Sequence, residues 1–399
     1  TRPSAGQIAR LRQAAERFSQ FLPLQAALAQ AYLQSGQSDD AATVAFRLLE
    51  SSRGDARAAA LATTIFRSAR QRPGLLSAAQ AWRAAIRSSD AERTRPADIA
   101  IADAAMRLNR PTVALAALQP HLSSAAGSSV EGATVAELAG AAWCALGRFD
   151  DTRALFEPLL GSSSEYRLAF LRLIGESTID AGTAAAWIEL VRARLDASSP
   201  VEALAFARAA VAAGTRLAAP QLFDPAMTAL TPLLAGDEPN LEAAYIAAAV
   251  SLRQDRLPEA QRLLRIVVTR DPNHAAAAND LAWAILATRG DLNEARSLAS
   301  RAITAQPNVA TYHETLARVE LELGNRDAAV AGFDAALRLE PSNVDALIGK
   351  AYVLRRNGDT AAARRLLAQV DPLLARNPPL SAMVKGQLQQ LRDELSRGE

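Results

Sequence analysis

Groups that bind metals or carry redox chemistry are scarce in this chain of 399 residues. It has one cysteine, Cys144, which cannot form a disulfide within the chain, and three histidines, none with a second histidine or cysteine at a metal-ligand spacing. Cys144 stands among apolar neighbours, so we expect a buried packing residue. We predict no metal site and no cofactor.

Motifs that carry catalysis are missing as well. There is no glycine-rich phosphate loop, and Gly161, followed by three serines, lacks the strand-turn-helix context of a nucleophile elbow. The carboxylate pairs Asp39 with Asp40 and Asp150 with Asp151 stand at expected helix starts, where the positive end of the helix dipole stabilises them. The sequence therefore predicts no catalytic residues and a protein that is not an enzyme.

Long apolar runs and an excess of one charge are also absent. The longest apolar candidates, such as Ala243 to Leu252, are about half the length of a membrane-spanning helix. The 44 basic and 42 acidic residues give a formal net charge of +2. Nucleic-acid arms and membrane-surface helices need clustered positive charge. We expect neither a nucleic-acid partner nor a membrane span.

Helical periodicity is what the sequence has in abundance. Half of the residues are hydrophobic but only 5% are aromatic, so alanine and leucine must supply most of the packing. Runs with the period-two alternation of strands are absent. Segments with helical periodicity number about 22, and most are joined by two to four residues, as antiparallel neighbours require. The predicted fold class is all-α.

A spacing of about 34 residues recurs toward the C-terminal end. Four alanines fall 35, 34 and 34 residues apart: Ala260, Ala295, Ala329 and Ala363. Prolines follow the first three alanines by twelve residues: Pro272, Pro307 and Pro341. A small residue lets two antiparallel helices approach to the short end of the usual range of about 8–10 Å. We expect Gly324 and Gly358 to end first helices in left-handed caps and the prolines to end second helices.

These units resemble tetratricopeptide repeats position by position. The clearest unit runs from Ala310 to Asn343. Its consensus positions are held, in chain order, by Leu316, Ala317, Gly324, Ala329, Phe333, Ala336 and Pro341. The resemblance implies an α-solenoid, a superhelix of antiparallel helix pairs in which each pair needs its neighbours to cover an apolar face.

The repeat pattern divides the chain into three expected segments. Residues 1–235 are expected to form divergent helical repeats of irregular length, and residues 241–376 four regular repeats. The loop Ala235 to Asn240 marks the boundary between them. After Pro378 and Pro379, residues 378–399 are expected to form a capping helix, because apolar residues recur there at helical spacing: Val384, Leu388, Leu391 and Leu395.

The resemblance also implies a binding surface, the concave face lined by the first helix of each pair. Carried onto this sequence, the groove positions of the family predict that a partner protein or peptide binds at Tyr245, Arg253, Asn279, Asp280, Trp283, Glu314, Tyr352 and Arg356. Trp283 and Tyr352 are the sharper candidates, since aromatic anchors dominate the binding energy of many interfaces. Alternatively both pack against the adjacent repeat, and Asn279 caps or bridges neighbouring helices.

Two ligand classes of helical repeats fit these positions poorly. Repeats that hold the acidic C-terminus of chaperones use a clamp of Lys, Asn and Arg, of which the fifth and sixth positions here offer only Asn279. RNA binding needs basic and aromatic residues at the same position of successive units. The ninth position is assigned to Ala249, Trp283, Val319 and Tyr352, which do not form such a ladder.

Two functions follow from this interpretation. The first is a scaffold or adaptor in a multi-component assembly. Bacterial repeat proteins similar to this chain over Asn279 to Trp283 and at Gly290 and Asp291 often serve envelope or exopolysaccharide export systems as lipoproteins or periplasmic adaptors. The resemblance thus favours a periplasmic or outer-membrane-lipoprotein location over the cytoplasm. The second is a regulatory arm of a larger enzyme, such as a glycosyltransferase, because the chain starts at Thr1 and we expect a segment upstream.

Overall fold

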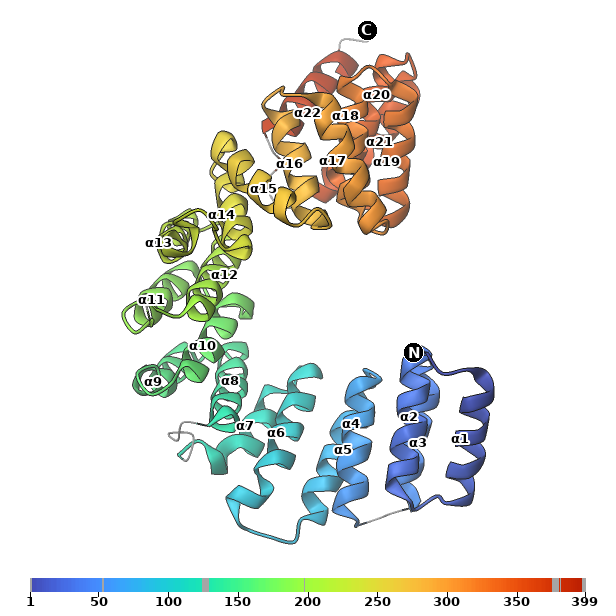
Figure 1. Cartoon of the computed structure of the whole chain (residues 1–399), viewed down its shortest axis with the longest axis vertical. Helices are drawn as coiled ribbons and strands as arrows, with labels where there is room; N and C mark the ends of the chain where they lie inside the picture. The colour runs from blue at the N-terminus through green and yellow to red at the C-terminus, as the bar shows by residue number, and fades with distance from the viewer. Residues whose placement is uncertain are drawn as a thin grey trace. The chain divides into compact units, whose positions relative to one another are not determined.

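The protein is built from α-helices. The computed structural model describes residues 2–51, 54–123, 129–196, 198–374, 380 and 382–396. Within these ranges there are 22 α-helices and two short 3-10 helices, without a β-strand (Figure 1). The all-α prediction and the expected number of helices are confirmed. Pro378 and Pro379, expected to precede the capping helix, lie outside the described residues.

The chain divides into two compact units, Thr1–Ala226 and Met227–Glu399. In the first unit, consecutive helices pack as neighbours. Its elements are α1 (Ala5–Arg17), α2 (Leu22–Gln34), α3 (Ser38–Ser51), α4 (Ala56–Ser68), α5 (Arg72–Ala85), α6 (Ala91–Arg107), α7 (Pro111–Leu118), η1 (Gln119–His121), α8 (Val130–Ala145), α9 (Phe149–Leu159), α10 (Ser164–Glu176), α11 (Ala181–Arg192), α12 (Pro200–Arg216), η2 (Pro220–Leu222) and the start of α13 (Phe223–Leu234). Cys144 is buried in α8, as predicted.

The helices α10 to α12 of the first unit do not follow the regular order in which each helix packs mainly against the next one in the sequence. Helix α10 packs directly against α12, although α11 stands between them in the sequence (Figure 1). Gly175 of α10 faces Ala209 of α12 at this contact: a Cβ on Gly175 would lie 3.7 Å from the Cα of Ala209, an ordinary van der Waals distance. Arg216 of α12 also donates to the carbonyl oxygen of Ile174 in α10, at 3.2 Å. Small residues therefore let the two helices meet where the repeat consensus is absent.

The second unit contains four regular helix pairs and one further helix. Each first helix packs against its own second helix, and from the second pair on also against the second helix of the preceding pair. The elements are α14 (Leu241–Arg253), α15 (Leu257–Arg270), α16 (Ala275–Ala287), α17 (Leu292–Ala305), α18 (Ala310–Glu322), α19 (Arg326–Leu339), α20 (Val344–Arg356), α21 (Thr360–Leu374) and α22 (Ala382–Ser396).

The residues that define the period occupy the expected places. The four periodic alanines lie in the second helices and are completely buried. Helices α15, α17 and α19 each end two residues before a proline. Gly324 and Gly358 have φ of +87° and +91°, the left-handed conformation that follows the first helix in two of the pairs. The residues that recur with this period therefore mark both the contacts between helices and the ends of helices.

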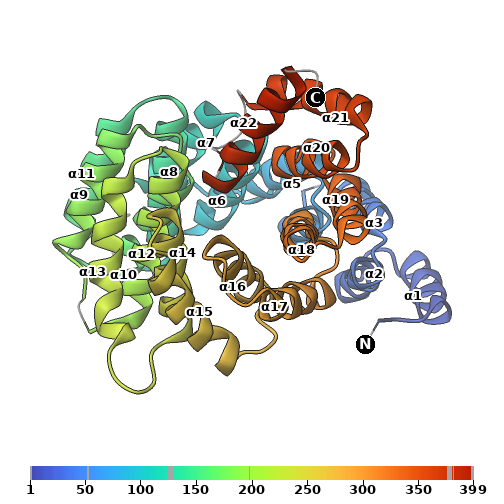
Figure 2. The ribbon, with the colours of Figure 1, turned by 90° about the horizontal axis from the view of Figure 1, so that it is seen from above.

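Helix α22 covers the apolar end of the last pair. It packs against α20, and Figure 2 shows the two helices side by side. Four of its side chains are buried: Val384, Leu388, Leu391 and Leu395. They join clusters formed by α20 and α21, including Ile348, Ala351 and Val370. Without α22 these apolar residues would lose their cover.

Gly349 of α20 shows how closely the helix pairs pack against each other. A Cβ on Gly349 would lie 2.3 Å from the Cζ of Phe333, a fully buried residue of α19. Overpacking of this kind costs about 1–3 kcal/mol, so Gly349→Ala should lower the unfolding free energy by about that amount in urea denaturation. Gly386→Ala is the control, because its Cβ would meet no atom within 4 Å. Equal stabilities of the two variants would contradict the expectation.

Candidate functional site

The candidate surface is made by the first helices α14, α16, α18 and α20, and we call it the first-helix face. Helix α16 packs against α18, and α18 packs against α20. Between α14 and α16 the connection is made by side chains, since the rings of Tyr245 and His274 have centroids 4.7 Å apart. The predicted binding residues fall into two groups on this face.

The first group is centred on Asp280 of α16. The hydroxyl of Tyr245, from α14, donates to Oδ2 of Asp280 at 3.2 Å. The Nδ2 of Asn279 donates to Oδ1 of the same carboxylate at 3.3 Å. Asn279 is buried, whereas Tyr245 and Asp280 are half-buried. The structure therefore brings together three of the predicted residues from two successive repeats.

The electrostatics of this group show which side chains surround the carboxylate. Burial raises the pKa of Asp280, while the hydrogen bonds from Asn279 and Tyr245 and the charge of Arg253 lower it. Burial, followed by the charge of Asp280, raises the pKa of Tyr245. The same two causes raise the pKa of Tyr312 in α18. Tyr312, which the sequence did not single out, therefore belongs to the group, and we call Tyr245, Asn279, Asp280 and Tyr312 the Asp280 cluster.

Trp283 and Arg253 lie on the same helices as the cluster. Trp283 follows Asp280 by three residues on α16, so the two share one side of the helix, and its ring is half-buried. Its indole N–H makes no hydrogen bond with any described residue. Arg253, at the end of α14, is exposed and donates to the carbonyl oxygen of Ala249 at 3.1 Å. Both retain donors for a partner.

The second group, Glu314, Tyr352 and Arg356, lies beside α22. The hydroxyl of Tyr352 donates to Oε1 of Gln390 in α22 at 3.4 Å, and Arg356 donates to that hydroxyl at 3.1 Å. Glu314 is buried and accepts from the guanidinium of Arg318. These three predicted residues are thus engaged by other side chains of the chain.

Arg318 connects three helices of the second unit. It pairs with Glu314 in its own helix, donates to Oε1 of Gln387 in α22 at 2.6 Å, and donates to the carbonyl oxygen of Asp345 in α20 at 2.8 Å. Its side chain is 2% exposed. A buried guanidinium with partners on three helices fixes α22 against α18 and α20.

The register of α18 corrects one assignment made from the sequence. Because α18 begins at Ala310, its ninth residue is Arg318, and Val319, assigned to that position, is completely buried. The spacing of Glu314 and Arg318, four residues apart on one side of a helix, was the signal that could have found the pair. With Arg318 buried and paired, the corrected ninth positions still form no exposed ladder of basic and aromatic residues.

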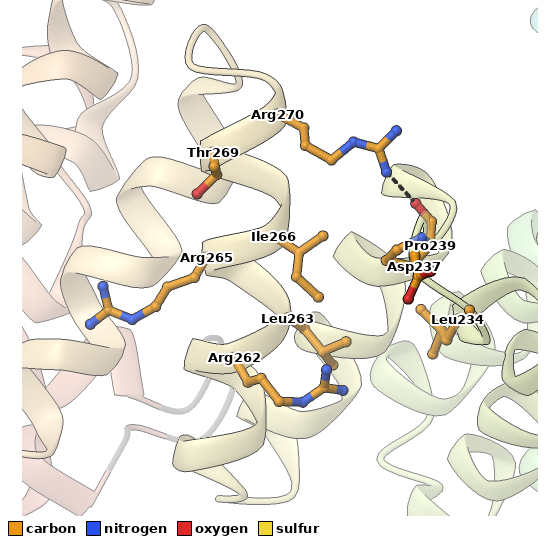
Figure 3. A pocket seen from close by; sticks show the side chains of 10 residues that line it. Leu234, Asp237, Pro239, Arg262, Leu263, Arg265, Ile266, Thr269 and Arg270 are labelled. Carbon is orange, nitrogen blue, oxygen red and sulfur yellow. Dashed lines mark hydrogen bonds between the residues drawn. The ribbon is translucent and has the colours of Figure 1, made fainter.

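A cleft of about 480 Å³ lies elsewhere on the second unit, between α15 and the loop before α14 (Figure 3). Its three arginines all have partners. Arg262 pairs with Glu259 at 2.7 Å, Arg265 pairs with Glu294, and Arg270 donates to the carbonyl oxygen of Pro239 at 2.9 Å. The bond from Arg270 to Pro239 therefore ties this loop to the first regular repeat, and Asp237 of the loop also lines the cleft.

Among the described residues, no group of three His, Cys, Asp or Glu side chains could hold a metal ion. No helix of the same residues is both long enough and apolar enough to cross a membrane.

Stacked antiparallel helix pairs with buried alanines at their contacts define an α-solenoid of helical repeats. A family model described as tetratricopeptide repeat matches residues 226–310 and 314–379, and a second model with the same description matches residues 5–65. Together the matches cover slightly more than half of the chain. The chain belongs to the tetratricopeptide repeat family, as the units predicted. Repeats of this family bind proteins or peptides, which supports a protein-protein interaction scaffold.

The individual proteins similar to this chain match it either over a short segment or at low sequence identity. The probable biofilm formation methyltransferase WspC of Pseudomonas putida is 33% identical over 115 residues, which are 28% of this chain and 27% of the relative. The chain thus spans about a quarter of the length of this curated relative. A crystal structure of MamA is 19% identical with a TM-score of 0.35, over 41% of this chain and 95% of MamA. A chain of the APC/C heterotetramer Cut9–Hcn1 is 13% identical with a TM-score of 0.38, over 99% of this chain and 87% of that one.

Proposed function

We propose that the chain is a non-catalytic scaffold that binds a partner protein or peptide on the first-helix face, at the part formed by α14 and α16. The residues expected to contact the partner are Tyr245, Arg253, Asn279, Asp280 and Trp283. The proposal rests on one observation, the difference between two groups of the predicted residues. Glu314 and Tyr352 are engaged by Arg318 and α22, whereas the residues of α14 and α16 keep half-exposed rings and unused hydrogen-bonding groups.

Trp283 is the residue of this surface with the largest expected contribution. A half-buried indole with a free N–H can bury further apolar area and gain a hydrogen bond when a partner binds. Aromatic anchors of this kind often dominate the energy of an interface. We therefore assign Trp283 the role of anchor.

Replacing this anchor tests the proposal. Trp283→Ala should weaken partner binding by more than about 1 kcal/mol, or about fivefold, and leave helicity unchanged. Partners are first captured from a lysate of the source organism, and the purified partner is then titrated by calorimetry. Leu339→Ala is the control, since Leu339 is exposed on the second helix α19. Equal partner affinities of the wild type and Trp283→Ala would reject the proposal.

We further propose that the scaffold serves an envelope or exopolysaccharide export assembly, in the periplasm or attached to the outer membrane as a lipoprotein. This part of the proposal depends on the similarity of Asn279 to Trp283, with Gly290 and Asp291, to bacterial repeat proteins of such systems. Fractionation of the source organism tests it. Recovery of the protein in the cytoplasmic fraction alone would exclude this location.

One observation favours a second function, a regulatory repeat arm of a larger enzyme. The relative WspC is described as a methyltransferase, and the similarity covers only 27% of it, so the segment similar to this chain stands beside much additional sequence in that protein. The complete gene distinguishes the two functions. A signal peptide or lipobox as the only addition supports the scaffold, and a catalytic domain supports the arm.

A further inference from the structure

We propose that the Asp280 cluster is a binding site for a basic side chain, lysine or arginine, contributed by the partner. This inference depends on the proposed function and adds the chemistry by which the partner is recognised. Its basis is the imbalance of charge and hydrogen-bonding groups in the cluster.

The cluster has more acceptors than donors. A carboxylate offers about four lone-pair positions, and among the described residues Asp280 accepts hydrogen bonds only from the hydroxyl of Tyr245 and the amide of Asn279. The Oδ1 of Asn279, on a side chain that is 7% exposed, accepts no hydrogen bond from any described residue. The hydroxyl of Tyr312 donates its hydrogen bond to Oε1 of Gln306, at 3.4 Å, and not to Asp280. A ligand that satisfies this site must therefore donate hydrogen bonds.

Asp280 also has no cation paired with it. It forms no ion pair within the described residues, and Arg253 and His274 act on it only through their charges. The fully buried carboxylates of the described ranges each pair with a cation from the chain: Asp98 with Arg83 and His121, Glu202 with Arg167, and Glu314 with Arg318. Among those described residues Asp345, half-buried like Asp280, likewise forms no ion pair, but it lies beside Arg318. A carboxylate that is withdrawn from water without such a partner is costly, and a cation from another molecule relieves that cost.

Aromatic rings stand beside this carboxylate. Tyr245 contacts it from α14, Tyr312 lies near it on α18, and Trp283 follows it on α16. Aromatic residues are only 5% of the chain, so three of them on successive first helices are a local concentration. The faces of such rings attract ammonium and guanidinium groups. Ring contacts and the carboxylate therefore favour the same class of ligand, a long cationic side chain.

The test compares charged and neutral peptides on the full chain. The probe is an immobilised library of octapeptides with arginine, lysine, citrulline or norleucine at one fixed position and the other positions randomised. We expect arginine and lysine peptides to be retained at least about tenfold more than citrulline and norleucine peptides. Asp280→Asn should abolish this preference. Circular dichroism shows whether the variant is folded.

One variant serves as the control. Asp345→Asn removes another half-buried carboxylate of the first-helix face whose pKa burial raises, but which lies near Glu314 and Arg318, and the preference for arginine and lysine peptides should persist. If Asp345→Asn abolishes the preference, or if Asp280→Asn leaves it unchanged, the assignment is wrong.

The failure of this inference can be told apart from failure of the proposed function. Equal retention of all four peptide classes, or retention of none, overturns the cation site. If peptides are retained without a charge preference and are lost in Trp283→Ala, the proposed binding face stands and only its chemistry is wrong. If the native partner binds wild type and Trp283→Ala equally, the binding face itself is wrong.

Discussion

Removal of residues 380–399 is expected to lower the melting temperature of the protein by about 10 °C or more, or to cause aggregation. The deletion takes away four buried apolar side chains of α22, each contributing about 1.5–3 kcal/mol of transfer free energy. It also uncovers Ile348, Ala351 and Val370, which belong to the clusters that α22 completes. A solenoid whose last pair is uncovered exposes a contiguous apolar surface.

Thermal melting and light scattering measure the effect. The point variant Leu391→Ala, at a completely buried position of α22, should by itself lower the unfolding free energy by about 2–5 kcal/mol. Lys385→Ala, on the exposed side of the same helix, is the matched control and should change little. A deletion variant that stays monomeric and melts like the wild type would show that α22 contributes no cover.

The regular part of this fold could be predicted because its determinants are local and repeated. An alanine at a helix crossing, a glycine with positive φ and a proline after a helix end each act within a few residues of their own position. Ala329, Gly324 and Pro341 are the examples in one unit. Because equivalent residues recur about every 34 positions, each unit supports the assignment of its neighbours. The contact of α10 with α12 has no such signal, because Gly175 and Ala209 are recognisable as a crossing only once the helices are placed.

The candidate site was less predictable because it depends on contacts between repeats. The fifth and sixth positions name Asn279 and Asp280 as candidates, but only the neighbouring helix shows that Tyr245 donates to the carboxylate. Tyr312 lies at the third position of its unit, outside the family's groove positions. The path of α22 across α18 and α20 follows from contacts between helices distant in sequence. No spacing in the sequence indicates which predicted residues that helix engages.

Loss of the Arg318 side chain is expected to destabilise the second unit strongly. Arg318→Ala is expected to lower the unfolding free energy by about 3–5 kcal/mol, because it leaves the buried carboxylate of Glu314 without its cation. The same change removes the bonds from Arg318 to Gln387 and to the carbonyl oxygen of Asp345. Arg262→Ala is the control, since its ion pair with Glu259 is exposed and should contribute less than about 1 kcal/mol.

A double variant separates the two causes of this loss. If most of it comes from the unpaired charge of Glu314, then Glu314→Leu with Arg318→Met should recover most of the lost stability, since apolar side chains of similar volume can replace a buried ion pair. If the bonds to α22 and α20 matter more, the double variant stays as unstable as Arg318→Ala. Urea denaturation gives the free energies. Stability of Arg318→Ala equal to that of Arg262→Ala would show that neither the pair nor the bonds across the three helices hold this end of the solenoid together.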